Sequence, residues 1–305
     1  MNESLDVYFH GMTVLTGAYR LDGPLPEPDG YREFLESHQF MGGESGMGAL
    51  LLARLGLQVR LEGTHLGRRT KEPVLEACRE RGIDARGLHF DPGFEGWQDL
   101  VLVHEGHRTV FGRFGTLLFD GSRHWSHPDR EAVRACRVAA VDPFLGESSE
   151  SAAKICVEEG KPYVTLDCGP GTLLSRDAAA VVVSREFTRR EHPHADVEHL
   201  MGRYLEASKG LVVFTAGSGD ILYARRGGTV HRFKPFPVEA VSTLGAGDAF
   251  RAGVVYGVLQ GWDDAQTVRF AAAMAACACR RFPLAFDPPT LEEVLVMMES
   301  RPSNA

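Results

Sequence analysis

The chain has 305 residues, of which 44% are apolar and 24% are charged, and its formal net charge is −8 at pH 7. This is the composition of a globular protein, and the length suits one large α/β domain. The acidic balance, with no dense run of Lys or Arg, argues against a nucleic-acid-binding surface. No apolar run approaches the ~20 residues of a membrane span, and the start lacks the basic residues of a signal peptide. We therefore expect a cytoplasmic protein, without a membrane partner, whose six cysteines are reduced.

Strand-like and helical runs alternate along most of the chain. In chain order, they are a strand over 6–10, a helix over 47–55, a strand over 57–62, a helix over 71–81, a strand over 138–141, a helix over 149–159, strands over 162–167 and 179–184, a helix over 196–208, a strand over 211–215, and helices over 249–259, 263–280 and 291–299. The alternation predicts a mostly parallel sheet with helices on both faces.

Two segments break this rhythm. Residues 13–39 are rich in Pro and Gly, and residues 97–114 predict a hairpin that turns at Glu105-Gly106-His107. Two surface loops are one reading. We favour a small β-lid within a single domain over 1–305, because ligands of open parallel sheets bind at the carboxyl ends of the strands, where such an insertion would lie.

The turn Gly245-Ala246-Gly247-Asp248, just before a long apolar helix, is the strongest chemical signal. Small residues let the backbone approach a ligand, and their N–H groups at a helix N-terminus form an anion cradle. Asp248 next to a bound phosphate suits a general base that takes the proton of an attacking hydroxyl. The alternative is a carboxylate that only stabilises the helix dipole. We predict a phosphoryl-transfer site in which the turn holds the transferred group.

With these pieces, the chain resembles the PfkB family of carbohydrate kinases, which have the ribokinase-like fold. Gly42-Gly43 and the following run 49–56 resemble the first family signature, and the turn before Asp248 with Ala249-Phe250 resembles the second. The segments 213–217 and 289–294 resemble the strand beside the nucleotide and the last helix. The sequence has no P-loop motif, which excludes that route to the same chemistry.

The resemblance implies a Rossmann-like core with a β-lid, ATP as phosphoryl donor, Mg²⁺, often a monovalent cation, and in many members a homodimer formed through the lid. It implies that Thr215, Gly217 and Thr243 line the nucleotide. It also places Gly42 and Gly43 beside the phosphoryl acceptor, although a Gly pair before a helix is by itself only a turn.

The sequence departs from the family pattern around the acceptor and the cations. Thr16 stands where the family has a sugar-gripping Asp, and Met47 stands where it has an Asn. Ser242 replaces an Asp, which weakens a monovalent-cation site. Neither residue of the usual Asn-x-x-Glu is present, and Glu186 is the substitute candidate for Mg²⁺, against a reading as a solvated loop acid.

Arginines near the expected acceptor site could favour an acidic acceptor, since guanidinium groups match carboxylates. The candidates are Arg113 in the lid, Arg68 and Arg69, each with the alternative of a solvated surface residue.

The sequence thus predicts an ATP-dependent kinase that phosphorylates an alcohol group of a small, sugar-like acceptor, with Asp248 as general base. One rival is a nucleoside kinase of the same family, which an aromatic stacking pair near Phe40, Trp97 or Phe111 would favour. The other is a non-catalytic ligand-binding protein, suggested by the departures from the family pattern.

Overall fold

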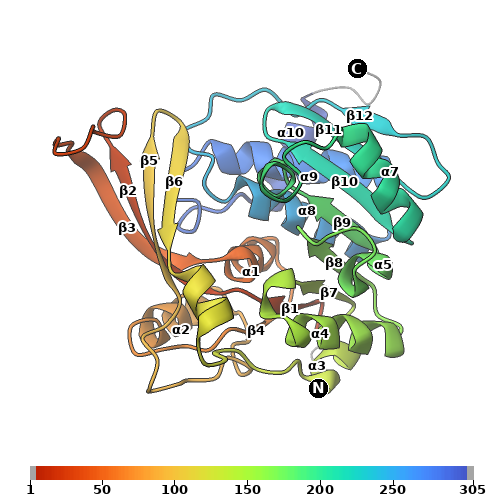
Figure 1. Ribbon diagram of the computed structural model, residues 1–305, viewed down its shortest axis with the longest axis horizontal. Coiled ribbons are helices and arrows are strands. Elements are labelled where there is room, and N and C mark those ends of the chain that lie inside the picture. Colours follow the sequence, from red (N-terminus) through yellow and green to blue (C-terminus); the bar gives the residue numbers. More distant parts are fainter. Residues whose placement is uncertain (1–4, 301–305) are drawn as a thin grey trace.

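The main sheet of the computed structural model has eight strands in the order β12-β11-β10-β9-β8-β7-β1-β4, and the structure describes residues 5–300 (Figure 1). Six of its strands are parallel. They are β1 (Val7–Gly11), β4 (Val59–Gly63), β7 (Val138–Val141), β8 (Tyr163–Leu166), β9 (Ala180–Val183) and β10 (Leu211–Ala216). The antiparallel strands β11 (Gly219–Ala224) and β12 (His231–Phe233) extend one edge. The predicted, mostly parallel α/β sheet is confirmed.

Helices cover both faces of this sheet (Figure 1). Val7 and Phe9 of β1 join the apolar cluster that includes α1, α8 and α9, whereas Tyr8 between them joins the cluster of α3, α4 and α7. This period of two is the geometry of a strand that is buried on both sides. The helices are α1 (Glu44–Arg54), α2 (Lys71–Glu80), α3 (Arg130–Ala135), α4 (Glu147–Glu158), α5 (Leu173–Arg176), α6 (Arg185–Glu191), α7 (Val197–Ala207), α8 (Ala246–Gln260), α9 (Asp264–Cys279) and α10 (Leu291–Glu299), with short helical turns η1 (Thr116–Asp120) and η2 (Pro143–Leu145).

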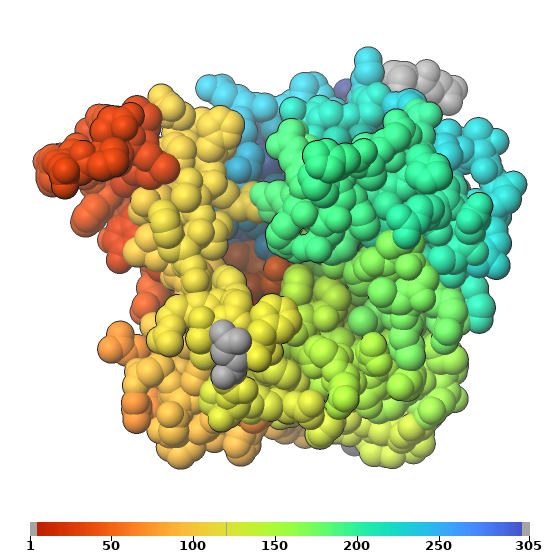
Figure 2. All heavy atoms as spheres, in the orientation of Figure 1, coloured from red at the N-terminus to blue at the C-terminus, as the bar shows by residue number. Residues whose placement is uncertain are grey.

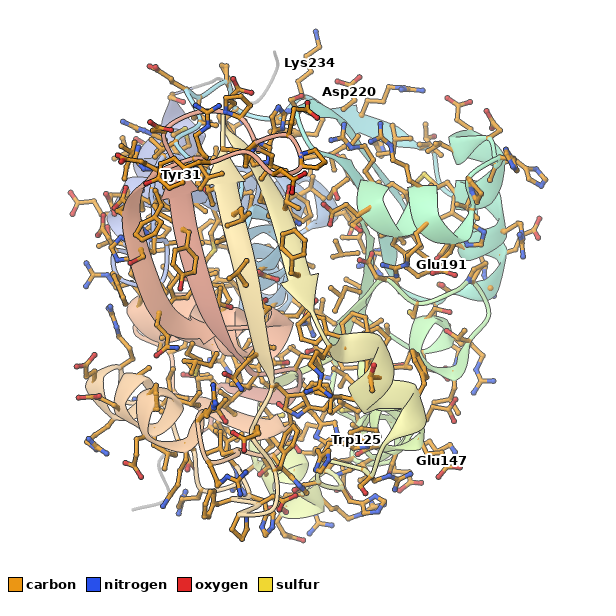
Figure 3. The ribbon with its side chains drawn as sticks, turned by 60° about the vertical axis from the view of Figure 1, so that its left-hand side comes forward. Tyr31, Trp125, Glu147, Glu191, Asp220 and Lys234 are labelled. Carbon is orange, nitrogen blue, oxygen red and sulfur yellow. The ribbon has the colours of Figure 1, made fainter. Side chains whose placement is uncertain are left out.

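A second sheet of four strands, in the order β3-β2-β5-β6, stands beside the main one (Figures 1 and 3). Its strands are β2 (Val14–Leu21), β3 (Phe34–Gly42), β5 (Gln98–His104) and β6 (His107–Gly112). The hairpin turn falls at Glu105 and Gly106, both with positive φ, where the sequence predicted it. The Pro- and Gly-rich character of 13–39 belongs mostly to the connection between β2 and β3, which form two long strands.

The sequence patterns missed several short elements. Helices α3, α5 and α6 and strands β11 and β12 span three to seven residues, too few for a hydrophobic period to register. The predicted helix over 47–55 begins earlier, at Glu44. Within the described residues, no helix is both long and apolar enough to cross a membrane.

Candidate active site

The turn before α8 has the geometry that its glycine requires. Gly245 is the N-cap residue of α8 with φ 82°, a left-handed conformation that a side chain disfavours. A Cβ at this position would also lie 2.7 Å from Cδ2 of Leu284. Asp248 is partly buried in the first turn of α8, directly after the small residues. The Ala246 N–H donates to the Thr243 carbonyl at 3.3 Å, whereas the N–H groups of Gly247 and Asp248 in the first helical turn have no acceptor within the helix and suit an anion.

One turn further along α8, a buried ion pair faces the same side as Asp248. Arg251 is 2% exposed and its Nη1 pairs with the carboxylate of Asp142, which is fully buried after β7. Asp142 Oδ2 also accepts hydrogen bonds from the Met12 N–H and the Ser45 hydroxyl, each at 2.7 Å. Nε and Nη2 of Arg251 are buried and have no hydrogen-bond partner among the described residues. These two donors are available to a ligand.

The carboxyl groups around Arg251 have perturbed pKa values. Burial raises the pKa of Asp248 to about 6; the guanidinium groups of Arg108 and Arg251 oppose this shift, while Asp142 and Glu186 add to it. Burial, followed by the charges of Asp142 and Asp248, raises the pKa of Glu44 well above its usual range. A carboxylate with a pKa near 6 is ionised at pH 7.5 and is a stronger base than an ordinary Asp.

The acceptor-side glycines lie against this cluster. A Cβ at Gly42 would lie 2.3 Å from Oγ1 of Thr16, and Gly43 has φ 79°, where a Cβ would lie 2.7 Å from the Met12 carbonyl oxygen. Met47 is buried in α1, and its Cγ lies 3.8 Å from a Cβ built at Gly245. The structure thus brings Gly42, Gly43, Thr16 and Met47 to the same region as the Gly245 turn.

Asp99 of β5 lies beside Thr16 on the inward face of the second sheet. The two residues are partners across the parallel pairing of β2 and β5. Burial raises the pKa of Asp99 to about 6, opposed by a hydrogen bond from Thr16, and its Oδ1 is buried without a hydrogen-bond partner among the described residues. A carboxyl group is therefore present near the position where the family pattern has its Asp, but it comes from a different strand.

The tip of the β5–β6 hairpin contacts Thr243 and Glu186, close to the Gly245 turn. Arg108 donates to both carboxylate oxygens of Glu186, at 2.9 and 3.0 Å, and to the Thr243 carbonyl at 3.4 Å. The Thr243 hydroxyl donates to the Gly106 carbonyl at 3.4 Å. Glu186, itself 71% exposed, is thus an ion-pair partner of the hairpin. Figure 2 shows the surface hollowed between the yellow atoms of this sheet and the green atoms of the opposite side.

The nucleotide-side candidates lie at the carboxyl end of β10. Thr215 is partly buried near the end of the strand, and Gly217 follows it with φ 65°. Nη2 of Arg185, from the start of α6, lies 3.2 Å from a Cβ built at Gly217. A guanidinium next to an open glycine turn suits a phosphate.

The arginines predicted for an acidic acceptor are exposed. Arg68 and Arg69 are 58% and 71% exposed and both pair with Glu95. Arg113 is exposed just after β6. The structure instead brings Arg251 next to Asp248.

Six residues of this region were given no role by the sequence interpretation: Glu44, Asp99, Arg108, Asp142, Arg185 and Arg251. Two of them carried a usable signal. Asp142 directly follows a buried strand, and Arg251 is a lone charge in an apolar helix, three residues after Asp248 and so on the same face.

Comparison with known proteins identifies the family. Residues 26–291 match the pfkB family carbohydrate kinase. The chain belongs to this family. It is a kinase, and the ribokinase-like expectation is confirmed.

Relatives of this kinase carry the names of two different kinase activities. A 5-dehydro-2-deoxygluconokinase from Clostridium perfringens is 33% identical over 289 residues, covering 84% of this chain and 83% of that protein. A nucleoside kinase from Methanothermobacter thermautotrophicus is 26% identical, covering 90% of each.

Solved structures agree in fold. Arabidopsis thaliana ribokinase complexed with ribose and ATP superposes with a TM-score of 0.80 at 18% identity, covering 97% of this chain and 99% of that one. A Burkholderia thailandensis nucleoside kinase in complex with inosine gives a TM-score of 0.72 at 17% identity, covering 96% and 98%. At these identities the likeness concerns the fold.

Proposed function

We propose that this pfkB kinase transfers the γ-phosphoryl group of ATP to an alcohol group of a small, sugar-like acceptor, with Asp248 as general base. The observation that carries the proposal is the position of Asp248. Its carboxylate lies directly behind the Gly245–Gly247 turn, with a pKa of about 6 due to burial. Asp248 takes the hydroxyl proton, the alkoxide oxygen bonds to the γ-phosphorus, and the bond to ADP breaks. The N–H groups of the turn stabilise the charge on the transferred group.

On the nucleotide side, we assign Thr215, Gly217, Thr243 and Arg185 to the phosphates and ribose of ATP. Bound Mg²⁺ would offset phosphate charge. Hard oxygen ligands suit this ion, and we assign to it Glu186, which lies next to Arg185 in the first turn of α6 and pairs with Arg108. Ser242 is buried and its hydroxyl oxygen accepts the Leu244 N–H, so it offers a neutral oxygen to a monovalent cation.

On the acceptor side, we assign Gly42, Gly43, Thr16, Met47 and Asp99 to the body of the acceptor. Nε and Nη2 of Arg251 suit a carboxylate or an electron-rich hydroxyl of the acceptor, because both donors are buried and unpaired. This favours an acidic sugar, which agrees with the name of the Clostridium perfringens relative. Arg113 at the end of β6 remains an additional candidate.

The nucleoside alternative has less support from the rings. Phe40 and Trp97 are 6% and 1% exposed, and Phe111 is 53% exposed on β6. Phe40 contacts Phe286 edge-on with ring centroids 6.0 Å apart, and Trp97 contacts Phe94 edge-on at 5.9 Å and lies tilted against Trp125 at 6.5 Å.

Acceptor-dependent release of ADP from ATP tests the proposal. The panel comprises 5-dehydro-2-deoxygluconate and related aldonates, neutral sugars such as ribose and fructose, and nucleosides such as adenosine and inosine. We expect the sugar acids to give the highest kcat/KM. Preference for nucleosides would move the acceptor assignment to the nucleoside class, and no ADP release with any compound would favour the non-catalytic alternative.

The pH dependence of kcat/KM should show the ionisation of Asp248, the proposed general base. Because burial raises the pKa of Asp248 to about 6, we expect log kcat/KM for the acceptor to be level above about pH 7 and to fall with a slope near 1 below about pH 6, as the carboxylate takes a proton. Stopped assays in overlapping buffers at constant ionic strength measure this limb. A profile that stays level down to pH 4.5 would contradict Asp248 as the base.

We further propose a homodimer formed through the second sheet, the small lid of this single-domain kinase. Its outward face carries exposed apolar side chains, including Leu100, Phe111 and Phe34 at 38%, 53% and 56% exposure. Leu100 and Phe111 are partners across the β5–β6 pairing, and exposed apolar surface favours association. Light scattering should give a mass near twice 33.4 kDa, and Phe111→Glu should shift it toward one chain. A monomeric parent protein at about 50 μM would contradict this assembly.

A further inference from the structure

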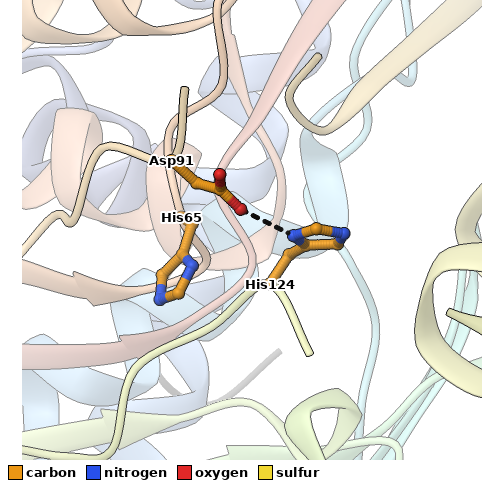
Figure 4. Close-up of side chains that lie close together, drawn as sticks. All are labelled: His65, Asp91 and His124. Carbon is orange, nitrogen blue, oxygen red and sulfur yellow. Dashed lines mark hydrogen bonds and ion pairs between the residues drawn. The ribbon is translucent and has the colours of Figure 1, made fainter. Parts of the chain in front are cut away.

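Three side chains with metal-binding atoms meet away from the proposed kinase site. His65 follows β4, Asp91 lies between α2 and β5, and His124 lies between η1 and α3. One ligand atom from each lies within 4.8 Å of the other two, and all three residues are partly buried. Figure 4 shows the imidazole rings on either side of the Asp91 carboxylate.

The backbones that carry these side chains are joined directly to one another. His65 N–H donates to the His124 carbonyl at 2.8 Å, and Asp91 N–H donates to the Leu66 carbonyl at 2.8 Å. Isolated β-bridges join Thr64 to Trp125 and Leu66 to Phe90, each one residue away from a ligand candidate. Their positions are therefore fixed by the fold and do not depend on flexible surface loops.

The rings are also oriented. His124 stacks on Phe94 with centroids 3.8 Å apart and an interplanar angle of 4°, and its Nδ1 lies 3.1 Å from Asp91 Oδ2. Nε2 of His65 lies 3.2 Å from the Ser126 hydroxyl, while its buried Nδ1 has no hydrogen-bond partner among the described residues. A histidine that hydrogen-bonds through one nitrogen and leaves the other unpaired is arranged as metal-binding histidines are.

We propose that His65, Asp91 and His124 bind a divalent transition-metal ion of the zinc class, with water completing the coordination. Two imidazole nitrogens and one carboxylate oxygen are a ligand set that suits Zn²⁺, whereas Mg²⁺ prefers oxygen ligands alone. On binding, the metal replaces the hydrogen bond between His124 Nδ1 and Asp91. Asp91 and the unpaired nitrogen of His65 then move toward the ion. The ligand atoms must move together somewhat, since zinc–ligand bonds are about 2.0–2.2 Å.

The position of the site points to a structural role. Asp91 precedes β5, and His124 follows β6 by way of η1, so the two residues flank the base of the β5–β6 hairpin. His65 belongs to the segment that leaves the main sheet. Next in sequence to these residues, Phe94 and Trp97 form a small apolar cluster with Met12 and Val14, and Trp125 packs against this cluster. Figure 3 labels Trp125. A bound ion would tie the base of the hairpin to β4 and stabilise this junction against unfolding.

Metal titration of the full-length protein, stripped with EDTA and dialysed, tests the proposal without kinase turnover. We expect calorimetry to show one Zn²⁺ per chain with a Tm that rises on binding, no Tm increase with Mg²⁺ in the absence of nucleotide, and a visible Co²⁺ spectrum typical of four-coordinate geometry. The double variant His65→Ala/His124→Ala should lose zinc affinity by at least about 100-fold.

Two further variants distinguish zinc binding at the His65–Asp91–His124 site from binding by other histidines and from loss of folding. His104→Ala/His107→Ala removes the pair of hairpin histidines whose ring centroids are 6.4 Å apart, and it should bind zinc like the parent. Asp91→Asn keeps an acceptor for His124 but removes the charge, so it should weaken binding by about tenfold or more, and it serves where the double alanine variant fails to fold. No stoichiometric zinc in the parent protein, or equal affinity in the parent and in whichever cluster variant folds, would overturn the proposal.

Discussion

Asp248→Asn should lower kcat by about 10²–10⁴-fold while the protein stays folded and binds ATP. The amide matches the carboxylate in shape but cannot take the proton of the acceptor hydroxyl. The Gly245 turn, which supplies backbone N–H groups, is untouched by the change. Single-turnover assays with the best acceptor, together with a fluorescence titration of nucleotide, separate chemistry from binding.

The same substitution should raise stability at neutral pH. Burial raises the pKa of Asp248 to about 6, so the folded state holds the proton more tightly than the unfolded chain does. Above about pH 6 the ionised carboxylate therefore destabilises the fold, and the neutral amide avoids this. Since the side chain is only partly buried, we expect a gain on the order of 1–2 kcal/mol and a Tm higher by about 2–3 °C at pH 7.5. The gain should shrink as the pH falls from about 6 to about 4.

Asp196→Asn is the matched control. Asp196 caps α7 by accepting the His199 N–H, and Asn caps helices about as well as Asp. This isosteric change, at the start of a helix other than α8, should leave turnover and Tm nearly unaltered. Close to full turnover in the Asp248→Asn enzyme would exclude Asp248 as the base.

The features best predicted from the sequence are those formed by residues that are close together along the chain. The Gly245–Asp248 turn is local, and its chemistry follows from small residues at a helix start. The order of strands and helices, and the hairpin turn at Glu105-Gly106, follow from hydrophobic period and turn residues in the same way. These parts of the fold are confirmed.

Side chains that meet from distant segments could not be predicted. Asp142 and Arg251 are 109 residues apart, and only the sheet order brings the carboxyl end of β7 under α8. Asp99 posed a different problem. Both faces of β5 carry apolar residues, such as Val101 inward and Leu100 outward, so alternation alone does not indicate which face the carboxylate takes.

The buried ion pair of Arg251 and Asp142 is the second place where a single substitution should have a large effect. Arg251→Met leaves the fully buried Asp142 charge without its counter-ion, so we expect the free energy of unfolding to fall by about 3–5 kcal/mol. It also removes the two unpaired N–H donors that we assign to the acceptor. Urea unfolding at pH 7.5 measures the first effect. Acceptor and ATP KM values, measured separately, report the second.

The double variant Asp142→Asn/Arg251→Met separates stability from binding. The amide that replaces the Asp142 carboxylate is neutral, and its oxygen can still accept from the Met12 N–H and the Ser45 hydroxyl, which both bind Asp142 in the parent. Because no unpaired buried charge remains, most of the lost stability should return. The acceptor KM should nevertheless stay raised by about 10–150-fold, the loss expected for hydrogen bonds from a charged donor, with the ATP KM close to that of the parent. A stable double variant with an unchanged acceptor KM would show that Arg251 only supports the fold, whereas an equal rise in both KM values would indicate distortion of the whole site.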